Sequence, residues 1–190
     1  MRHLITVLLC TCALPAFATD VAEPADKARA YVASALQTWA TDPRLVAAVR
    51  DQNSRHNALT QTDIDALDKQ WMGELGRSVQ PTIAGVVTNP VSDMLRQQVE
   101  QSAGLITEVF VMDAIGLNVA ASGITSDYWQ GDEDKFNETY PKGADAIHIS
   151  DVDFDESAQL YQIQASFTLT DPADGTVIGA VTVGLNAEQL

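Results

Sequence analysis

The sequence predicts an α+β fold in which a group of helices precedes an antiparallel β-sheet. Apolar residues recur at the helical period as far as Gly104, and beyond it they alternate at the period of two that strands require. Short turn-forming segments, rather than helices, separate the strand-like stretches. Because the helices precede the strands instead of alternating with them, the strands are expected to pair antiparallel.

The composition is that of a globular protein with an acidic surface. The 190-residue chain is 46% hydrophobic, 6% aromatic and 19% charged, and its formal net charge is -15. Such a surface repels phosphate groups, so we expect neither nucleic acid nor an anionic membrane as a partner. The charge is compatible with cationic ligands and metal ions.

The first eighteen residues have the pattern of a secretory signal peptide. A basic start, Arg2-His3, precedes an apolar run at 4–14 and the small-x-small ending Ala16-Phe17-Ala18. We therefore expect cleavage after Ala18 and export to a bacterial periplasm. Both cysteines lie inside this segment, so the mature chain is expected to have no disulfide and no thiolate metal site.

The mature chain, 19–190, is expected to form one folded unit with a helical region at 19–104. Amphipathic spacing and capping residues predict four helices, at 25–39, from Asp42-Pro43, from Thr60 or Thr62 to Gly76, and from Asn89-Pro90 to Gly104. Trp39 and Trp71 lie on the apolar stripes of their helices, so both are expected in the core rather than at a ligand. The stretch 80–88 is expected to be a loop or a short strand.

The region 105–190 is expected to hold the sheet. Strands are predicted at 106–112, 117–122, 146–152, 160–170 and 177–185. The connections at 113–116, 153–157 and 171–175 are expected to be turns. In 160–170 the odd-numbered residues are apolar apart from Tyr161, and Gln162, Gln164, Ser166 and Thr168 form a polar face. Part of this strand could form the floor of a pocket.

The stretch Leu117–Phe136 is the strongest candidate for a binding site. Tyr128 and Trp129 can supply flat apolar walls, and Ser126, Asp127 and Gln130 can supply hydrogen bonds. Alternatively, the aromatic residues are anchors of a helix that lies on the sheet, because Trp129 and Phe136 are seven residues apart. Both interpretations hold if that helix covers a cavity over the sheet.

Metal-binding and catalytic interpretations find little support. Asp151, Asp153 and Asp155 match the first three ligand positions of an EF-hand loop, but Glu156 and Gln162 replace the glycine and the bidentate glutamate that the loop requires. The mature chain has two histidines, at distant positions, and neither a Gly-x-Ser-x-Gly motif nor a phosphate-binding glycine loop occurs. We therefore expect no metal, no cofactor and no enzymatic activity.

Three segments give the sequence a resemblance to the Cache family of extracytoplasmic, PAS-like sensor domains. They are Glu108–Ser122, Thr125–Phe136 and Asp171–Val181, which follow a long N-terminal helix. The resemblance implies a sheet of five or six antiparallel strands, with a small ligand between the sheet and the loop-helix segment after the second strand. It maps that ligand onto Ser126, Asp127, Tyr128, Trp129 and, on the facing strand, Tyr161 and Ser166.

Two departures from the family pattern shape the functional hypothesis. Family members that bind amino acids place an arginine beside the aromatic pair, whereas Asp127 stands there in this chain, which favours an amine or another cation. The sequence also ends at Leu190, just after the last predicted strand. We therefore expect a stand-alone exported sensor that binds a small polar or cationic metabolite and signals through a separate membrane sensor kinase, chemoreceptor or transporter.

An alternative hypothesis is a structural or interaction protein. Its pocket would be filled by its own side chains, and its helical layer at 19–104 would form the working surface, as in a homodimer.

Overall fold

The computed structural model describes residues 23–36, 40–156 and 159–190. The signal peptide expected at 1–18 and Trp39 lie outside the described residues. Within them, no helix combines the length and the apolar character needed to cross a membrane.

The predicted capping residues begin three of the helices. Asp42 accepts a hydrogen bond from the Arg44 N–H, Asn89 accepts two at the first turn of its helix, and Thr60 forms a capping box with Asp63. The helical elements are α1 (Pro24–Tyr31), the π-helical turn η1 (Val32–Leu36), α3 (Pro43–His56), α4 (Gln61–Glu74), α5 (Pro81–Val87) and α6 (Pro90–Gln101).

Helix α5 corrects the expectation of a loop or short strand at 80–88. Its first N–H groups are capped from another helix, because the buried Glu74 carboxylate accepts hydrogen bonds from Thr82 N at 2.9 Å and Ile83 N at 3.1 Å. Burial by itself raises the pKa of Glu74, and the hydrogen bonds from Thr82, Ile83 and Gln70 outweigh it and lower the pKa. Glu74 therefore remains an anionic cap.

Six strands form one antiparallel sheet, which confirms the α+β class. The strand order is β2-β1-β6-β5-β3, and β4 pairs with the other end of β5. The segment 153–157, expected as a turn, therefore contains a strand at its start. The strands are β1 (Ile106–Met112), β2 (Asn118–Ala121), β3 (Ile147–Ile149), β4 (Asp153–Asp155), β5 (Leu160–Thr170) and β6 (Val177–Asn186).

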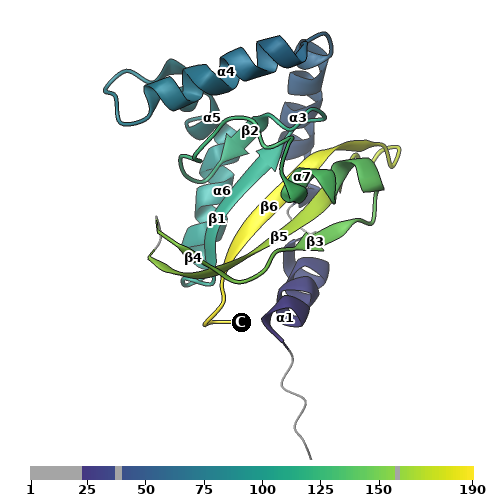
Figure 1. The fold of residues 1–190 in the computed structure, drawn as a ribbon. Helices are drawn as coiled ribbons and strands as arrows, with labels where there is room; N and C mark the ends of the chain where they lie inside the picture. The colour runs from purple at the N-terminus through teal and green to yellow at the C-terminus, as the bar shows by residue number, and fades with distance from the viewer. Residues whose placement is uncertain (1–22, 37–39, 157–158) are drawn as a thin grey trace, which may run out of the picture.

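The two faces of the sheet have different covers (Figure 1). Helices α1, α3 and α6 pack on one face, which we call the helix face, where side chains such as Val111, Ala165 and Val183 are fully buried in the main hydrophobic core. The other face, the lid face, is covered by the segment between β2 and β3. That lid segment (residues 122–146) contains the short helices α7 (Asp134–Asn137) and η2 (Tyr140–Lys142).

Candidate functional site

The start of the lid segment is tied to the β1–β2 turn by backbone contacts. Trp129 forms a β-bridge with Leu117, and its indole Nε1–H donates to the Ile115 carbonyl at 2.8 Å. The Gly116 carbonyl accepts from Gln130 N at 2.8 Å. A Cβ at Gly116, where φ is +86°, would lie 2.5 Å from the Gly131 Cα, so only glycine permits this approach.

Helix α4 holds the same segment from the other side. The Asp68 carboxylate accepts hydrogen bonds from the backbone N–H groups of Tyr128 at 2.8 Å and of Trp129 at 3.0 Å. The Trp71 ring, fully buried as expected, stacks on Tyr128 with centroids 5.4 Å apart and an interplanar angle of 9°. Tyr128 and Trp129 are therefore part of the framework that positions the lid segment.

The middle of the lid face is filled by the protein's own side chains. Phe136 of α7 is buried and stacks on Tyr140 with ring centroids 5.2 Å apart. Beneath this part of the lid segment, the fully buried Ser166 and Thr182 hydroxyls bond each other at 2.9 Å. A ligand would therefore have to displace side chains to reach Ser166.

Open space remains on the lid face beside α7, where a cavity of about 460 Å³ lies between β1, β5 and the lid segment. Its volume is within the range of small-molecule sites. We call it the sheet-face cavity and define it by five lining residues: Glu108, Phe110, Gln130, Lys135 and Gln164.

The sheet-face cavity has fixed charges of both signs. The Glu108 carboxylate accepts hydrogen bonds from the amides of Gln162 at 2.9 Å and Gln164 at 3.1 Å, so strand β5 sets its position. The Lys135 amine is 2.9 Å from the Glu133 carboxylate, donates to the Gln130 amide oxygen at 3.2 Å and lies 5.4 Å from the Phe110 ring centroid. Lys135 is thus already paired, whereas Glu108 is bonded only to neutral amides among the described residues.

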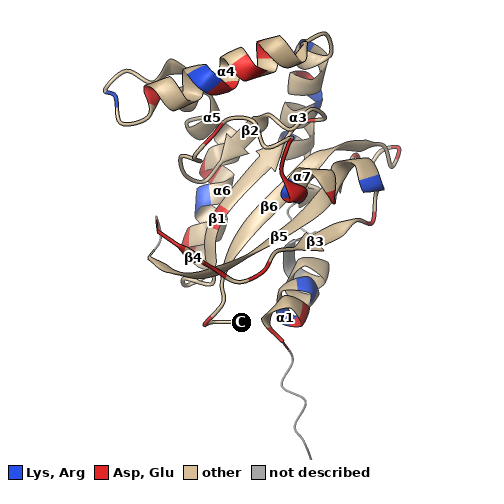
Figure 2. Cartoon of the chain, in the orientation of Figure 1, with Lys and Arg blue, Asp and Glu red and all other residues tan. Residues whose placement is uncertain are grey.

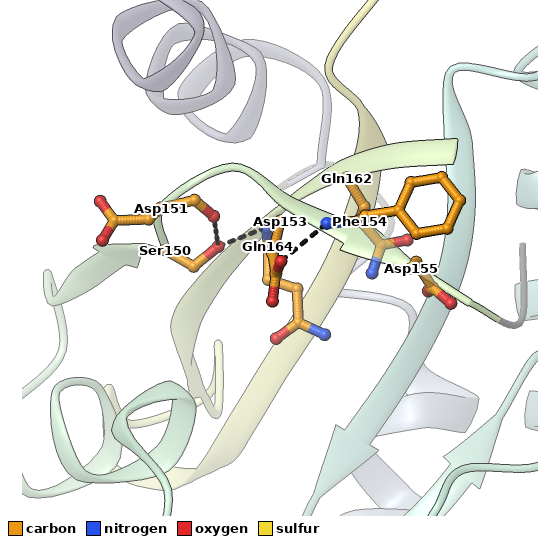
Figure 3. A pocket seen from close by; sticks show the side chains of 7 residues that line it. All are labelled: Ser150, Asp151, Asp153, Phe154, Asp155, Gln162 and Gln164. Atoms are coloured by element: carbon orange, nitrogen blue, oxygen red, sulfur yellow. Dashed lines mark hydrogen bonds between the residues drawn. The ribbon is translucent and has the colours of Figure 1, made fainter. Parts of the chain in front are cut away.

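Two further hollows adjoin the cavity, and Gln164 lines all three. One, of about 390 Å³, lies against β4, where Ser150 accepts a hydrogen bond from the Gln164 backbone N–H at 2.9 Å (Figure 3). The other, of about 540 Å³, lies between α7 and β3 and includes His148. Acidic side chains outnumber basic ones around both hollows, and Figure 2 shows them along the chain leading into β4.

The structure brings two of the expected site residues, Ser126 and Gln130, to the sheet-face cavity. Asp127 lines none of the three hollows. Its Oδ1 atom accepts hydrogen bonds from Ser126 Oγ at 2.9 Å and from Gln130 Nε2 at 2.6 Å, so this carboxylate orders the lid segment.

The other expected site residues are distributed elsewhere. Tyr128 faces the helices and Trp129 anchors the segment, while Ser166 lies under the lid segment. Tyr161 has the strand parity of Ile163, which is buried on the helix face; its side chain is 52% exposed and contacts Phe154 at the β4 edge. Tyr161 and Ser166 therefore do not meet in one cavity.

Sequence reasoning missed Glu108 and Lys135 as site residues, and it placed Gln164 only on a polar strand face that could form the floor of a pocket. Glu108 did leave a signal, because an acid stands in the mainly apolar strand Ile106–Met112 on the same side as Phe110. Lys135 lies in an acidic run and gave no comparable signal. In the described part of the chain, no three His, Cys, Asp or Glu side chains gather in a way that could hold a metal ion.

No protein-family model and no curated protein matches the chain. Among solved structures, it is similar to the sensor domain of the V. cholerae histidine kinase DctB, with 12% identity and a TM-score of 0.46 over 87% of this chain and 55% of that one. It is also similar to the E. coli DcuS sensor domain, with 13% identity and a TM-score of 0.46 over 87% and 90% of the two chains.

A third similar structure is the sensory domain of the Campylobacter jejuni chemoreceptor Tlp3 with isoleucine bound. The identity is 19% and the TM-score 0.40, over 85% of this chain and 63% of that one. The chain spans 42%, 55% and 62% of the lengths of the first three solved chains that it matches.

Proposed function

We propose that the chain is an exported, Cache-like ligand-binding protein that holds a small amine-bearing metabolite in the sheet-face cavity. The observation that carries this proposal is the Glu108 carboxylate, fixed at the cavity by two glutamine amides and lacking a cationic partner among the described residues. A ligand ammonium group would supply that partner through a charge-assisted hydrogen bond.

The charges around the cavity favour a cation over an anion. The lining contains the acids Glu108, Asp155 and Glu156 and one base, Lys135, whose amine is already paired with Glu133. The net charge of the whole chain, -15, acts in the same direction by attracting cations to the surface. We therefore propose that Glu108, in place of Asp127, binds the amine group of the ligand.

The ligand would signal by stabilising one arrangement of the lid segment. Gln130 and Lys135 belong to that segment and line the cavity, while Glu108 and Gln164 belong to the sheet. A ligand that contacts both sets favours the closed arrangement by its difference in affinity for the two states. A separate membrane partner, such as a sensor kinase, chemoreceptor or transporter, would read that arrangement.

The test is a thermal-shift and calorimetric screen with primary amines, amino acids and carboxylates. An amine ligand at about one hundred times its dissociation constant adds about 2.7 kcal/mol to the free energy of unfolding. Glu108→Gln is expected to weaken amine binding at least tenfold. Glu188→Gln, the same change at an exposed residue, is the matched control and should leave binding unchanged. Equal binding by both variants would refute the role of Glu108.

A second candidate function, an interaction protein, is favoured by a separate observation. Phe136 and Tyr140 fill the middle of the lid face, and four large apolar side chains are exposed in α4, the loop after it and the start of the lid segment. These are Met72, Leu75, Val79 and Ile124. If no compound in the screen stabilises the protein and light scattering shows a dimer that Val79→Asp dissociates, this function replaces the first.

A further inference from the structure

A pocket of about 620 Å³ lies among the helices, away from the lid-face hollows. Helices α3, α5 and α6, strand β2 and the Tyr128 side chain form its walls, and it shares no lining residue with the three hollows on the lid face. We call it the interhelical pocket. Because the two sites are separate, the interhelical pocket can hold an occupant whether or not the sheet-face cavity binds a ligand.

The walls of the interhelical pocket are mainly apolar. Ala48, Val86, Val91 and Val119 contribute aliphatic surface from four different elements. Gly85 of α5 also lines it, and a Cβ added to this glycine would meet no atom within 4 Å. An apolar wall with open space in front of it suits the hydrocarbon part of a small molecule.

Tyr128 lines this pocket, and its hydroxyl has no hydrogen-bond partner among the described residues. The side chain is 7% exposed, and stacking on Trp71 fixes its ring. Buried tyrosine hydroxyls usually find a partner, so this one is positioned to donate to an occupant. Burial, aided by the Asp113 carboxylate and opposed by Arg55, raises the pKa of Tyr128 to about 12, which keeps the donor proton in place at neutral pH.

Two hydrogen-bond acceptors face the same space. The fully buried Asp113 carboxylate takes a hydrogen bond from His56 Nδ1 at 2.8 Å and from Gln52 Nε2 at 3.0 Å. The imidazole tautomer that makes this contact carries its proton on Nδ1, which leaves Nε2 as an acceptor. Gln52 is 6% exposed, and its amide oxygen has no partner among the described residues. Both residues line the pocket.

The charged residues at the pocket are neutralised within the protein. Arg44 pairs with Asp42 at 2.7 Å, and Arg55 pairs with Asp51. A charged ligand would therefore lose its hydration without gaining an unpaired counter-charge. The occupant that matches one donor, two acceptors and apolar walls is uncharged and has a single group that both accepts and donates.

We propose that the interhelical pocket is a second binding site, for an uncharged, mainly apolar small molecule that carries one hydroxyl group. The ligand hydroxyl accepts from Tyr128 and donates to Gln52 or His56, while its ring or aliphatic body lies against Val86 and Val119. A methyl ether of the same body can accept but cannot donate, so the two compounds distinguish this arrangement from simple apolar contact.

The test titrates the full mature protein with p-cresol and with its methyl ether, and follows backbone amide signals by NMR. We expect p-cresol to shift amides of α3, α5 and β2 and to bind at least fivefold more tightly than the ether. Tyr128→Phe removes only the hydroxyl and should abolish that preference without unfolding the protein. Equal binding of the two compounds, or shifts confined to the sheet-face cavity, would overturn the proposal.

A blocking variant provides an independent check. Gly85→Leu places a side chain in the open space of the pocket and improves helix propensity, so the variant should fold and lose p-cresol binding at least tenfold. Gly73→Leu is the matched control, because Gly73 also lies in a helix and an added Cβ there also meets nothing within 4 Å. Unchanged binding to Gly85→Leu would place the ligand elsewhere and refute the site.

Discussion

The two faces of the sheet are built from the same strands but serve different purposes. On the helix face, neighbouring strands present Val111, Val183 and Ala165, all fully buried against helices. On the lid face, the residues beside them include Glu108 and Gln164, which hydrogen-bond each other and border open space. One face holds the molecule together, and the other leaves polar groups available.

This difference separates two sources of stability. Burial of apolar surface, at about 25 cal/mol per Å², dominates on the helix face. On the lid face, a smaller apolar cluster that includes Phe110, Tyr128 and Phe136 holds the lid segment together with hydrogen bonds and stacked rings, and each net hydrogen bond contributes about 1 kcal/mol. We expect a face held in this way to change arrangement without unfolding the sheet, as the proposed ligand binding requires.

The largest expected effect separates the faces directly. Leu185→Ala removes a fully buried side chain from the helix face and should lower the free energy of unfolding by about 2–5 kcal/mol. Gln164→Ala on the lid face should cost about 1 kcal/mol or less, because Gln162 still bonds Glu108. Urea denaturation measures both values. Equal losses would erase the distinction between the faces.

A smaller effect is expected where helix α4 holds the lid segment. Asp68→Ala leaves the N–H groups of Tyr128 and Trp129 without their acceptor and should cost about 1–3 kcal/mol. Hydrogen exchange should accelerate at these two amides and stay unchanged in β5 and β6. Asp65→Ala, an exposed position on the same helix, is the control. Faster exchange throughout the sheet would show that the lid segment and the sheet are one cooperative unit.

The smallest effect is a pH dependence that originates at Tyr128. Its pKa is raised to about 12 in the folded protein, against about 10 in an unfolded chain. The raised pKa means that this stabilising contribution is complete below pH 10 and is lost as the pH rises towards 12. At pH 11 the loss is on the order of 1 kcal/mol. Thermal denaturation of the protein and of Tyr128→Phe at pH 9 and pH 11 should show this loss in the protein alone; an equal decline in the variant would assign it to other groups.

The sequence signals that proved sufficient were local ones. Asp42, Thr60 and Asn89 cap their helices through bonds that span two or three residues, so residue type and spacing identify them. Alternation with a period of two located β1, β2, β5 and β6 within a residue or two. The same rule places Tyr161 and Ser166 on opposite faces, whereas the family resemblance had assigned both to one site.

Signals that depend on distant residues could not be recognised in the same way. Helix α5 contains glycine and a run of β-branched residues, and its cap, Glu74, comes from the preceding helix. The strand β4 exists because its backbone meets Leu160, Tyr161 and Gln162 at the sheet edge. Likewise, the sequence identified Asp127 as a candidate site residue. Only the structure shows that Ser126 and Gln130 both donate hydrogen bonds to its Oδ1 atom.

The contacts that hold the lid segment have a consequence for the order of folding. Tyr128 and Trp129 meet Asp68 across 60 and 61 residues of sequence, whereas the β5–β6 hairpin closes over a short turn at 171–175. Because closing a longer loop costs more entropy, we expect the hairpin to assemble early and the lid segment to dock late, after α4 is in place. A refolding chain would thus form the β5–β6 hairpin before Tyr128 takes its place in the wall of the interhelical pocket.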